Sequence, residues 1–204
     1  MRKLRKNNAA FKFLIKIWSK HCVLSEKHRA WALKNVLVSN GLRKGELLYF
    51  RGDSAKNIFL VTKGAIARTC EDEDGKRMIY NVAFAGMSLL TTRHLYSHTA
   101  IQNDIEVLHA GTEVLKISYT SLFKFREEER EVDILISMMA NKEKKQRDSL
   151  LVISRTKNPF KRGLRLAEDL PEVFYSLSQD EIAHLLDVSR STVQSVYRSL
   201  VGRK

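Results

Sequence analysis

The side chains best suited to recognise another molecule lie between residues 189 and 198. They are hydroxyl, amide or guanidinium groups: Ser189, Arg190, Ser191, Thr192, Gln194, Ser195 and Arg198. Arginine can pair in bidentate fashion with guanine and glutamine with adenine, while serine can contact several bases. No carboxylate lies in this stretch, so nothing in it would repel a nucleic-acid backbone. The chemistry indicated is hydrogen bonding to DNA, with Arg190 and Gln194 reading bases and Ser189, Thr192 and Arg198 contacting phosphates.

Two short helices must position these groups. Ser178 followed by Glu181 is typical of a capping box that begins the first helix. Asp187 then marks a turn, and Ser189 caps a second helix whose apolar residues are Val193, Val196 and Leu200. A capped helical hairpin within a bundle would share this pattern, but the outward polar face favours a helix-turn-helix that places its second helix in the major groove.

Charge is unevenly distributed along the 204 residues, which carry 36 basic and 23 acidic side chains for a net charge of +13. Residues 1–40 hold ten basic and one acidic side chain, and residues 142–204 hold thirteen and eight, whereas the middle is near neutral. Such a basic chain typically binds a polyanion, either nucleic acid or an anionic membrane surface. Two cysteines, Cys22 and Cys70, are too few for an all-cysteine iron–sulfur cluster and indicate reduced thiols.

Residues 1–40 are predicted to form a basic extension and helices. Phe11, Leu14, Ile15 and Trp18 share one helical face. That face could pack on the body, lie on a membrane surface or accompany a basic arm on DNA, and packing is favoured. A second helix is predicted over residues 26–39. No apolar run reaches the length of a membrane span, and nothing resembles an export signal, so a cytoplasmic location is expected.

Residues 41–119 change to a strand pattern. Short apolar runs separated by turns predict an antiparallel barrel or roll. Asp74-Gly75 is the signature of a hairpin turn. The predicted strands are 46–50, 58–62, 65–70, 78–84, 99–102, 106–110 and 113–118.

Residues 120–157 return to helix, with a short one at 120–125 and a long one at 131–154. Apolar residues of the long helix follow an a/d-like seam, in which Glu143 and Gln146 form a polar layer. The seam predicts a homodimer through residues 131–154; packing within one chain is the alternative. Asn158-Pro159 is the expected break before a C-terminal DNA-binding domain at 158–204. The apolar seam residues are Val132, Leu135, Ile136, Met139, Leu150 and Ile153.

The order of these parts resembles the CRP/FNR family of bacterial transcription regulators. The stretch KGELLYFRGDSAKNIFLVTKGAIA is similar to the early strands of that family, and SRSTVQSVYRSL is similar to its recognition helix. The resemblance implies an α+β chain: an antiparallel β-roll (double-stranded β-helix or jelly roll) sensor domain, a long dimerisation helix and a C-terminal helix-turn-helix. It implies a homodimer on palindromic double-stranded DNA, with RNA polymerase as a candidate partner and no enzymatic activity.

The effector site departs from the cyclic nucleotide-binding pattern. In the family a glutamate holds the ribose and an arginine neutralises the cyclic phosphate, but here Met87 follows Gly86 and His98 precedes Thr99-Ala100. Methionine is a weak acceptor and neutral histidine lacks the guanidinium fork. We therefore expect that cAMP is not a tight ligand and leave the effector unknown. The candidate pocket comprises Gly86, Met87, Ser88, His98, Thr99, Ala100, Glu143 and Gln146.

Other cofactors are not indicated. His94, His98 and His109 have no recognised ligand spacing, so neither haem nor a metal site is predicted, and no catalytic constellation is present.

Two further features depart from the CRP/FNR pattern in the DNA-binding part. Ser191 and Ser195 stand where family members often have Glu and Arg, so the operator is not transferable. The sequence ends at Lys204, so we expect a helix-turn-helix without a complete wing. The alternative function is a protein-interaction or membrane-surface module, built on the roll and the basic N-terminus with a vestigial DNA-binding domain.

Overall fold

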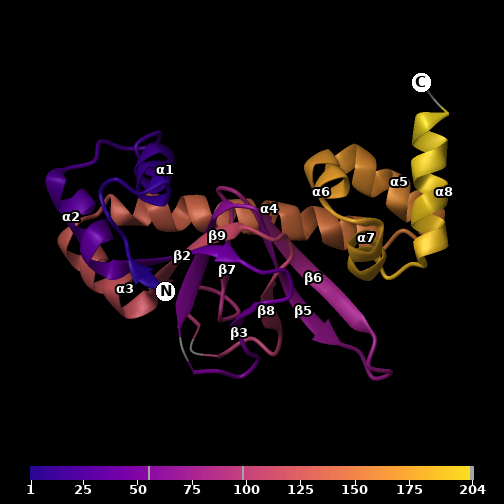
Figure 1. Cartoon of the computed structure of the whole chain (residues 1–204), viewed down its shortest axis with the longest axis horizontal. Coiled ribbons are helices and arrows are strands. Elements are labelled where there is room, and N and C mark those ends of the chain that lie inside the picture. The colour runs from indigo at the N-terminus through magenta and orange to yellow at the C-terminus, as the bar shows by residue number, and fades with distance from the viewer. Residues whose placement is uncertain (55, 98, 203–204) are drawn as a thin grey trace. The chain divides into compact units, whose positions relative to one another are not determined.

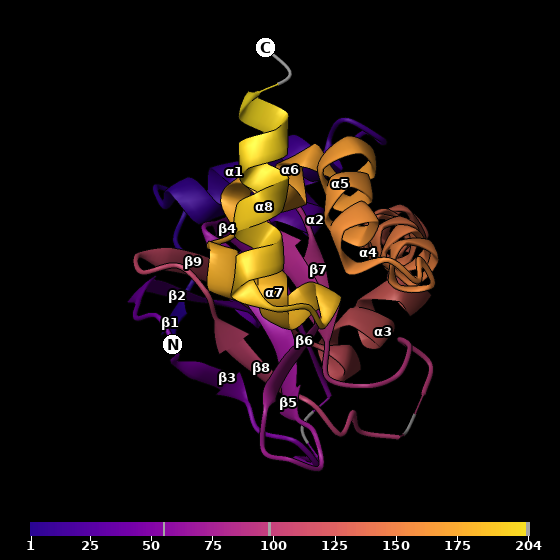
Figure 2. The ribbon, with the colours of Figure 1, turned by 90° about the vertical axis from the view of Figure 1, so that its right-hand side faces the viewer.

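The structure is a computed structural model that describes residues 1–54, 56–97 and 99–202. It divides into two compact units, residues 1–68 with 83–143 and residues 69–82 with 144–204. Figures 1 and 2 label the elements, which are β1 (Arg2–Lys3), α1 (Ala9–Trp18), α2 (Glu26–Asn35), β2 (Val36–Leu42), β3 (Leu47–Tyr49), β4 (Asn57–Lys63), β5 (Ala65–Glu71), β6 (Arg77–Phe84), β7 (Ser88–Leu90), β8 (Asp104–Val107), β9 (Thr112–Ser118), α3 (Tyr119–Glu128), α4 (Val132–Ser154), α5 (Pro159–Asp169), α6 (Pro171–Ser176), α7 (Gln179–Leu186) and α8 (Arg190–Val201).

The strands form two antiparallel sheets, which confirms the predicted roll. One sheet has the order β1-β2-β9-β4-β7 and the other the order β3-β8-β5-β6. Strand β9 lies between β2 and β4, with Val36 opposite Ile117 and Ile58 opposite the same residue. Apolar side chains of both sheets, among them Phe59, Ile66 and Val114, bury one another in the roll core. Burial on the inner faces is what holds the two sheets together.

The helix predicted for residues 26–39 was wrong at its end. Helix α2 stops at Asn35, and Val36 begins strand β2. Val36 and Val38 are buried, and β-branched side chains favour a strand where a neighbour can pair with them. Pairing with β9 supplies that neighbour, so tertiary contact overrides the local helical pattern.

Most of the other strand predictions are confirmed. The hairpin between β5 and β6 turns at the predicted place, where the Asp72 carboxylate accepts from the backbone N–H of Lys76 at 2.8 Å and Gly75 has φ +73°. The strand predicted at 99–102 was wrong, because that segment forms only an isolated bridge from Ala100 to Thr92. Strand β7, formed by residues Ser88–Leu90, was not predicted.

The N-terminal helices pack against the roll. The side chains of Phe11, Leu14 and Trp18 are buried in a cluster that also contains Trp31 and Phe125, whose rings stack at 4.9 Å. The packing prediction for α1 is therefore confirmed. The apolar face that a membrane-surface helix would need is covered by the protein itself.

The long helix α4 is also confirmed, and the first part of its apolar seam packs within the chain. Val132, Leu135 and Met139 are buried in the same cluster as Trp18, within a single chain. A side chain already packed in this way cannot also serve as a knob for a second copy. Among the described residues, no helix is both long enough and apolar enough to span a membrane.

Replacement of Trp18 by alanine should strongly destabilise the first unit. The indole is fully buried, and its Nε1–H donates to the Glu131 carbonyl at 3.3 Å. Truncation should lower the free energy of unfolding by about 3–5 kcal/mol, measured by urea denaturation. The exposed Lys12 on the same helix is the control, because Lys12→Ala should change stability by less than about 0.5 kcal/mol. Equal effects for the two variants would contradict the packing described here.

Candidate nucleic-acid interface and effector region

Helices α7 and α8 form the predicted helix-turn-helix. The Ser178 hydroxyl accepts from the Glu181 N–H at 3.3 Å and Glu181 accepts from the Ser178 N–H at 2.8 Å, so the capping box is confirmed. Asp187 ends α7 in the left-handed region with φ +49°, which a short polar side chain tolerates. Ser189 then caps α8 by accepting from the Thr192 N–H at 3.2 Å. The turn between the helices is thus set by local hydrogen bonds.

Helix α8 has one buried and one exposed side. Val193 and Val196 are buried against the neighbouring helices. On the other side Arg190, Ser191 and Ser195 are exposed, whereas Thr192 and Gln194 are half-buried. The structure thus brings all seven predicted DNA-contacting side chains onto or beside a single helix, and the exposed ones are Ser189, Arg190, Ser191, Ser195 and Arg198.

Several of the exposed side chains already have partners within the protein, Arg190 and Ser195 among them. Arg190 Nε lies 3.4 Å from Asp180 Oδ1, and both side chains are more than half exposed. The Ser195 hydroxyl donates to the Ser191 carbonyl at 3.0 Å. An exposed ion pair of this kind contributes little to stability and exchanges readily, so Arg190 can turn toward an anionic ligand at small cost.

Close packing with α5 and α6 fixes the orientation of α8. Gly163 of α5 lies so near Val196 that a Cβ on it would sit 2.7 Å from Val196 Cγ2. The Tyr197 hydroxyl donates to the Phe174 carbonyl at 3.3 Å, and the two rings are 4.6 Å apart. Arg162 Nη1 donates to the Leu186 carbonyl at 2.6 Å at the end of α7. Figure 2 shows α5, α6 and α7 gathered around α8.

The candidate effector residues are dispersed over several elements. Gly86 occupies a turn with φ +84°, and Met87 packs against the roll core. Ser88 lies fully buried in β7, where its hydroxyl is 3.5 Å from the Met139 carbonyl of α4. Thr99 is exposed and Ala100 half-buried.

Two further members of the candidate effector set lie on α4. Glu143 and Gln146 of α4 are both buried, and Gln146 Oε1 has no hydrogen-bond partner within the described ranges. His98 lies outside the described residues.

Beneath β7 lies a buried polar group that sequence reasoning missed. Arg68 of β5 places Nη1 3.1 Å from Glu143 Oε1 and donates through Nη2 to the Leu90 carbonyl at 2.8 Å. The Tyr119 hydroxyl lies 2.7 Å from Thr92 Oγ1, and burial raises the pKa of Tyr119 to about 12, so the phenol stays neutral. In the sequence, only the alternation of inward and outward side chains along β5 could have indicated that Arg68 points inward, because its partner Glu143 is distant in sequence.

Cys22 is poorly placed for reactivity. Cys22 is half-buried, and burial followed by the nearby Glu131 carboxylate raises the pKa of its thiol. A thiol with a raised pKa is a poor nucleophile at neutral pH.

The substitution Gly163→Ala should destabilise the second unit although alanine normally favours a helix. The added methyl would overlap Val196, and relief of the overlap should cost about 1–3 kcal/mol. Denaturant unfolding of Gly163→Ala, Val196→Ala and the double variant measures the coupling. The double variant should be more stable than the sum of the single effects by about 1–2 kcal/mol, and strict additivity would contradict the contact.

Known proteins share parts of this sequence and its fold. Residues 40–129 match the family model of the cyclic nucleotide-binding domain. No curated protein matches the sequence. Among solved structures, the chain is similar to a cyclic nucleotide-binding domain containing protein from Listeria monocytogenes EGD-e, with 18% identity, a TM-score of 0.70 and coverage of 94% of this chain and 91% of the other.

Two further structures share the fold. A putative transcriptional regulator of the crp/fnr family from Eubacterium rectale is 13% identical, with a TM-score of 0.65 and coverage of 93% and 88%. A CooA mutant from Carboxydothermus hydrogenoformans is 18% identical, with a TM-score of 0.67 and coverage of 98% and 87%. Residues 40–129 therefore resemble the cyclic nucleotide-binding domain, and the chain as a whole has the fold of the CRP/FNR regulators.

Proposed function

We propose that this chain is a sequence-specific, double-stranded DNA-binding transcription regulator of the CRP/FNR type. The observation that carries the proposal is the exposed polar face of α8, on which Arg190, Ser191, Ser195 and Arg198 are exposed while Val193 and Val196 hold the helix in place. A helix so mounted can enter a major groove with its first turn toward the base edges.

Within this interface the length and position of each side chain determine whether it contacts a base or a phosphate. Arg190 stands in the first turn of α8 and reads a base, with Gln194 one turn further on. Ser189, Thr192 and Arg198 contact phosphates, because a hydroxyl or a guanidinium toward the ends of the helix meets the backbone on either side of the groove. Ser191 and Ser195 are short and form the close contact surface between them.

Two copies would act together through α4, residues 131–154. Since Val132, Leu135 and Met139 are committed to their own chain, the pairing surface uses other faces of the helix. Leu151 and Val152 are 51% and 55% exposed, and Ile134 is half-buried, so these three supply apolar contact. Two-fold pairing would set two α8 helices on half-sites about 34 Å apart, one turn of the duplex.

The roll of this protein does not hold cAMP tightly. Met87 offers no carboxylate to a ribose, and the buried Arg68 is neutralised by Glu143 rather than left to meet a cyclic phosphate. Thr99 is exposed at the surface. If the roll has an effector, its chemistry differs from that of an anionic nucleotide held by an arginine fork.

Arg190→Ala should weaken binding to a selected duplex by about 1–3 kcal/mol and relax sequence preference. A genomic fragment selected with the purified chain supplies the duplex, and fluorescence anisotropy over a series of salt concentrations supplies Kd and its salt dependence. Arg43→Ala, an exposed arginine in the first unit, is the charge-matched control and should leave Kd unchanged.

Two results would overturn the assignment. Unchanged affinity and specificity in Arg190→Ala would remove the base-reading role. Absence of any duplex binding, together with pelleting on anionic vesicles, would support the membrane-surface module instead. The Asp180→Ala variant separates the ion pair from DNA contact, because it frees Arg190 and should not weaken binding.

Addition of cAMP should not change the thermal stability of the protein. A ligand present at 100 times its Kd stabilises a folded protein by about 2.7 kcal/mol, which a thermal melt detects easily. We expect no shift in Tm at millimolar cAMP and no change in Kd for duplex. A clear rise in Tm would show that Met87 and Thr99 belong to a working nucleotide site after all.

A further inference from the structure

A buried histidine in the first unit has one ring nitrogen without a hydrogen bond. His28 lies in the first turn of α2 and is 1% exposed. Its Nδ1 is 2.7 Å from the Ser25 hydroxyl and 3.1 Å from the Ser25 backbone nitrogen. Its Nε2 has no hydrogen-bond partner in the described part of the chain. A buried polar atom left in this way is costly and needs an explanation, of which a bound ion is one.

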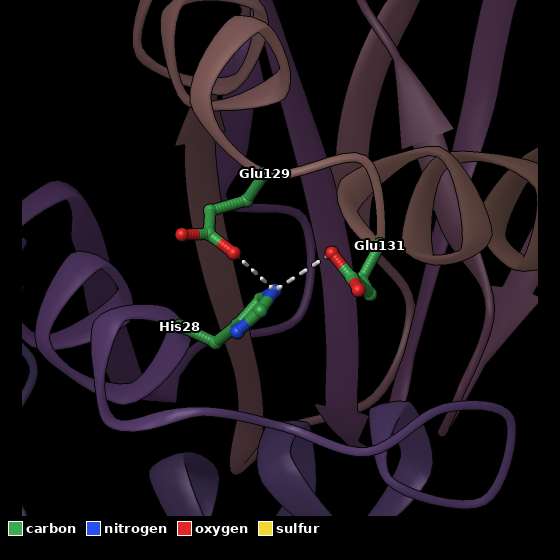
Figure 3. Close-up of side chains that lie close together, drawn as sticks. All are labelled: His28, Glu129 and Glu131. Atoms are coloured by element: carbon green, nitrogen blue, oxygen red, sulfur yellow. Dashed lines mark ion pairs between the residues drawn. The ribbon is translucent and has the colours of Figure 1, made fainter.

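Two carboxylates face that nitrogen. Glu129 follows α3 and Glu131 precedes α4, and each places Oε2 3.9 Å from His28 Nε2. This distance is too long for a hydrogen bond. The three ligand atoms lie within 4.8 Å of one another, and Figure 3 shows them converging on a common point from separate segments of the chain.

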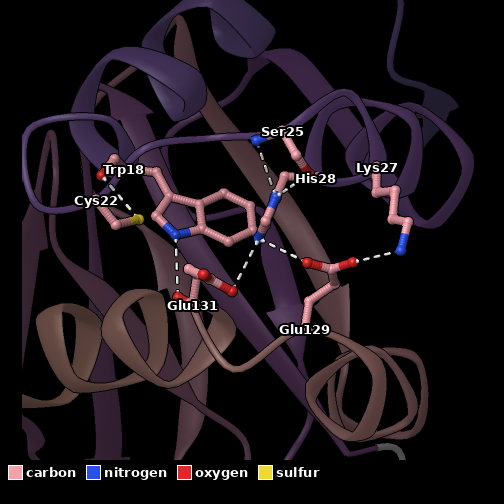
Figure 4. Close-up of polar contacts among 7 residues, drawn as sticks. All are labelled: Trp18, Cys22, Ser25, Lys27, His28, Glu129 and Glu131. Atoms are coloured by element: carbon pink, nitrogen blue, oxygen red, sulfur yellow. Dashed lines mark hydrogen bonds and ion pairs between the residues drawn. The ribbon is translucent and has the colours of Figure 1, made fainter.

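Neighbouring groups hold the two carboxylates (Figure 4). Lys27 Nζ lies 3.0 Å from Glu129 Oε1, so one oxygen of Glu129 is occupied and the other faces His28. Trp18 Nε1 donates to the backbone carbonyl of Glu131 at 3.3 Å, which anchors the segment that carries this side chain. Outer contacts of this kind orient the groups that bind metal ions in proteins.

Two aromatic rings pack against the imidazole of His28. The edge of the ring meets Trp18 at 5.1 Å and 86°, and Phe125 lies 5.5 Å away at 75°. The two ring contacts therefore fix the orientation of the imidazole. Its Nε2 is directed into the space between Glu129 and Glu131.

We propose that His28, Glu129 and Glu131 form a binding site for a divalent cation of the zinc class. One imidazole nitrogen and two carboxylate oxygens are ligands that zinc accepts, with water in a fourth position. Ligand atoms around tetrahedral zinc lie roughly 3.4 Å apart at bond lengths near 2.1 Å. Each observed 3.9 Å separation therefore needs to close by about half an ångström, through movement of the Glu129 and Glu131 side chains toward His28.

Binding would select one tautomer of His28. The metal takes the lone pair of Nε2, so the ring proton moves to Nδ1 and is donated to the Ser25 hydroxyl across the 2.7 Å contact. The Ser25 backbone N–H then no longer donates a hydrogen bond to Nδ1. The competing arrangement is a simple ion pair in which an imidazolium lies between two carboxylates.

Zinc binding by the tag-free, metal-stripped full chain tests the proposal. Isothermal titration with zinc chloride should show one ion per chain, and saturating zinc should raise Tm by about 5 °C or more. Glu131→Gln and Glu129→Gln keep the side-chain shape and should each weaken binding by about 100-fold, because loss of a supporting contact alone costs about 10–100-fold. Substitution with cobalt should give visible absorption bands that both variants lose.

Matched controls separate this site from adventitious binding. Glu127→Gln removes an exposed carboxylate on α3 outside the cluster and should bind zinc like the parent. Cys22→Ser should do the same, since the thiol donates to the Trp18 carbonyl and is not one of the three ligands. Absence of zinc binding by the parent, or unchanged affinity in Glu131→Gln, would overturn the site in favour of the ion pair. Loss of binding in Cys22→Ser alone would overturn it as well.

Discussion

Burial of one side of α4 is the interaction on which the rest of the first unit depends. Val132, Leu135 and Met139 meet Trp18 and the other aromatic residues of the N-terminal helices in a single apolar cluster. Because this cluster joins three segments that are distant in sequence, it fixes where α4 begins and how α1 and α2 lie on the roll. It also carries Glu131 to the histidine of α2. The same packing leaves other faces of α4 for the proposed pairing with a second copy.

The interior of the roll contains a buried ion pair. A guanidinium lies buried beneath β7, but Arg68 comes from β5 and is balanced by Glu143 of the chain itself. A buried charge of this kind needs its partner, because an unpaired one would cost several kcal/mol. The protein thus satisfies internally a charge that could otherwise attract an anionic ligand, in agreement with the absence of a glutamate at Met87.

Local signals were predictable from sequence and distant ones were not. Ser178 and Ser189 cap their helices through bonds to residues three positions away, so the helix-turn-helix could be read directly. Val36 looked helical because the pairing with β9 that makes it a strand involves Ile117. His28 attracted no attention for the same reason: its carboxylate neighbours follow about a hundred residues later, and no spacing rule links them.

The position of β2 in its sheet has a consequence for how the chain folds during synthesis. This strand leaves the ribosome early, yet its hydrogen-bonding partner β9 is made only after most of the roll. Until then only β1 can pair with β2, and the edge of β2 that faces β9 stays unpaired. Such edges are prone to wrong association. Closing so long a loop is also slow. Assembly of the sheet should therefore wait for residues 112–118, and a nascent chain arrested before them should depend on chaperones.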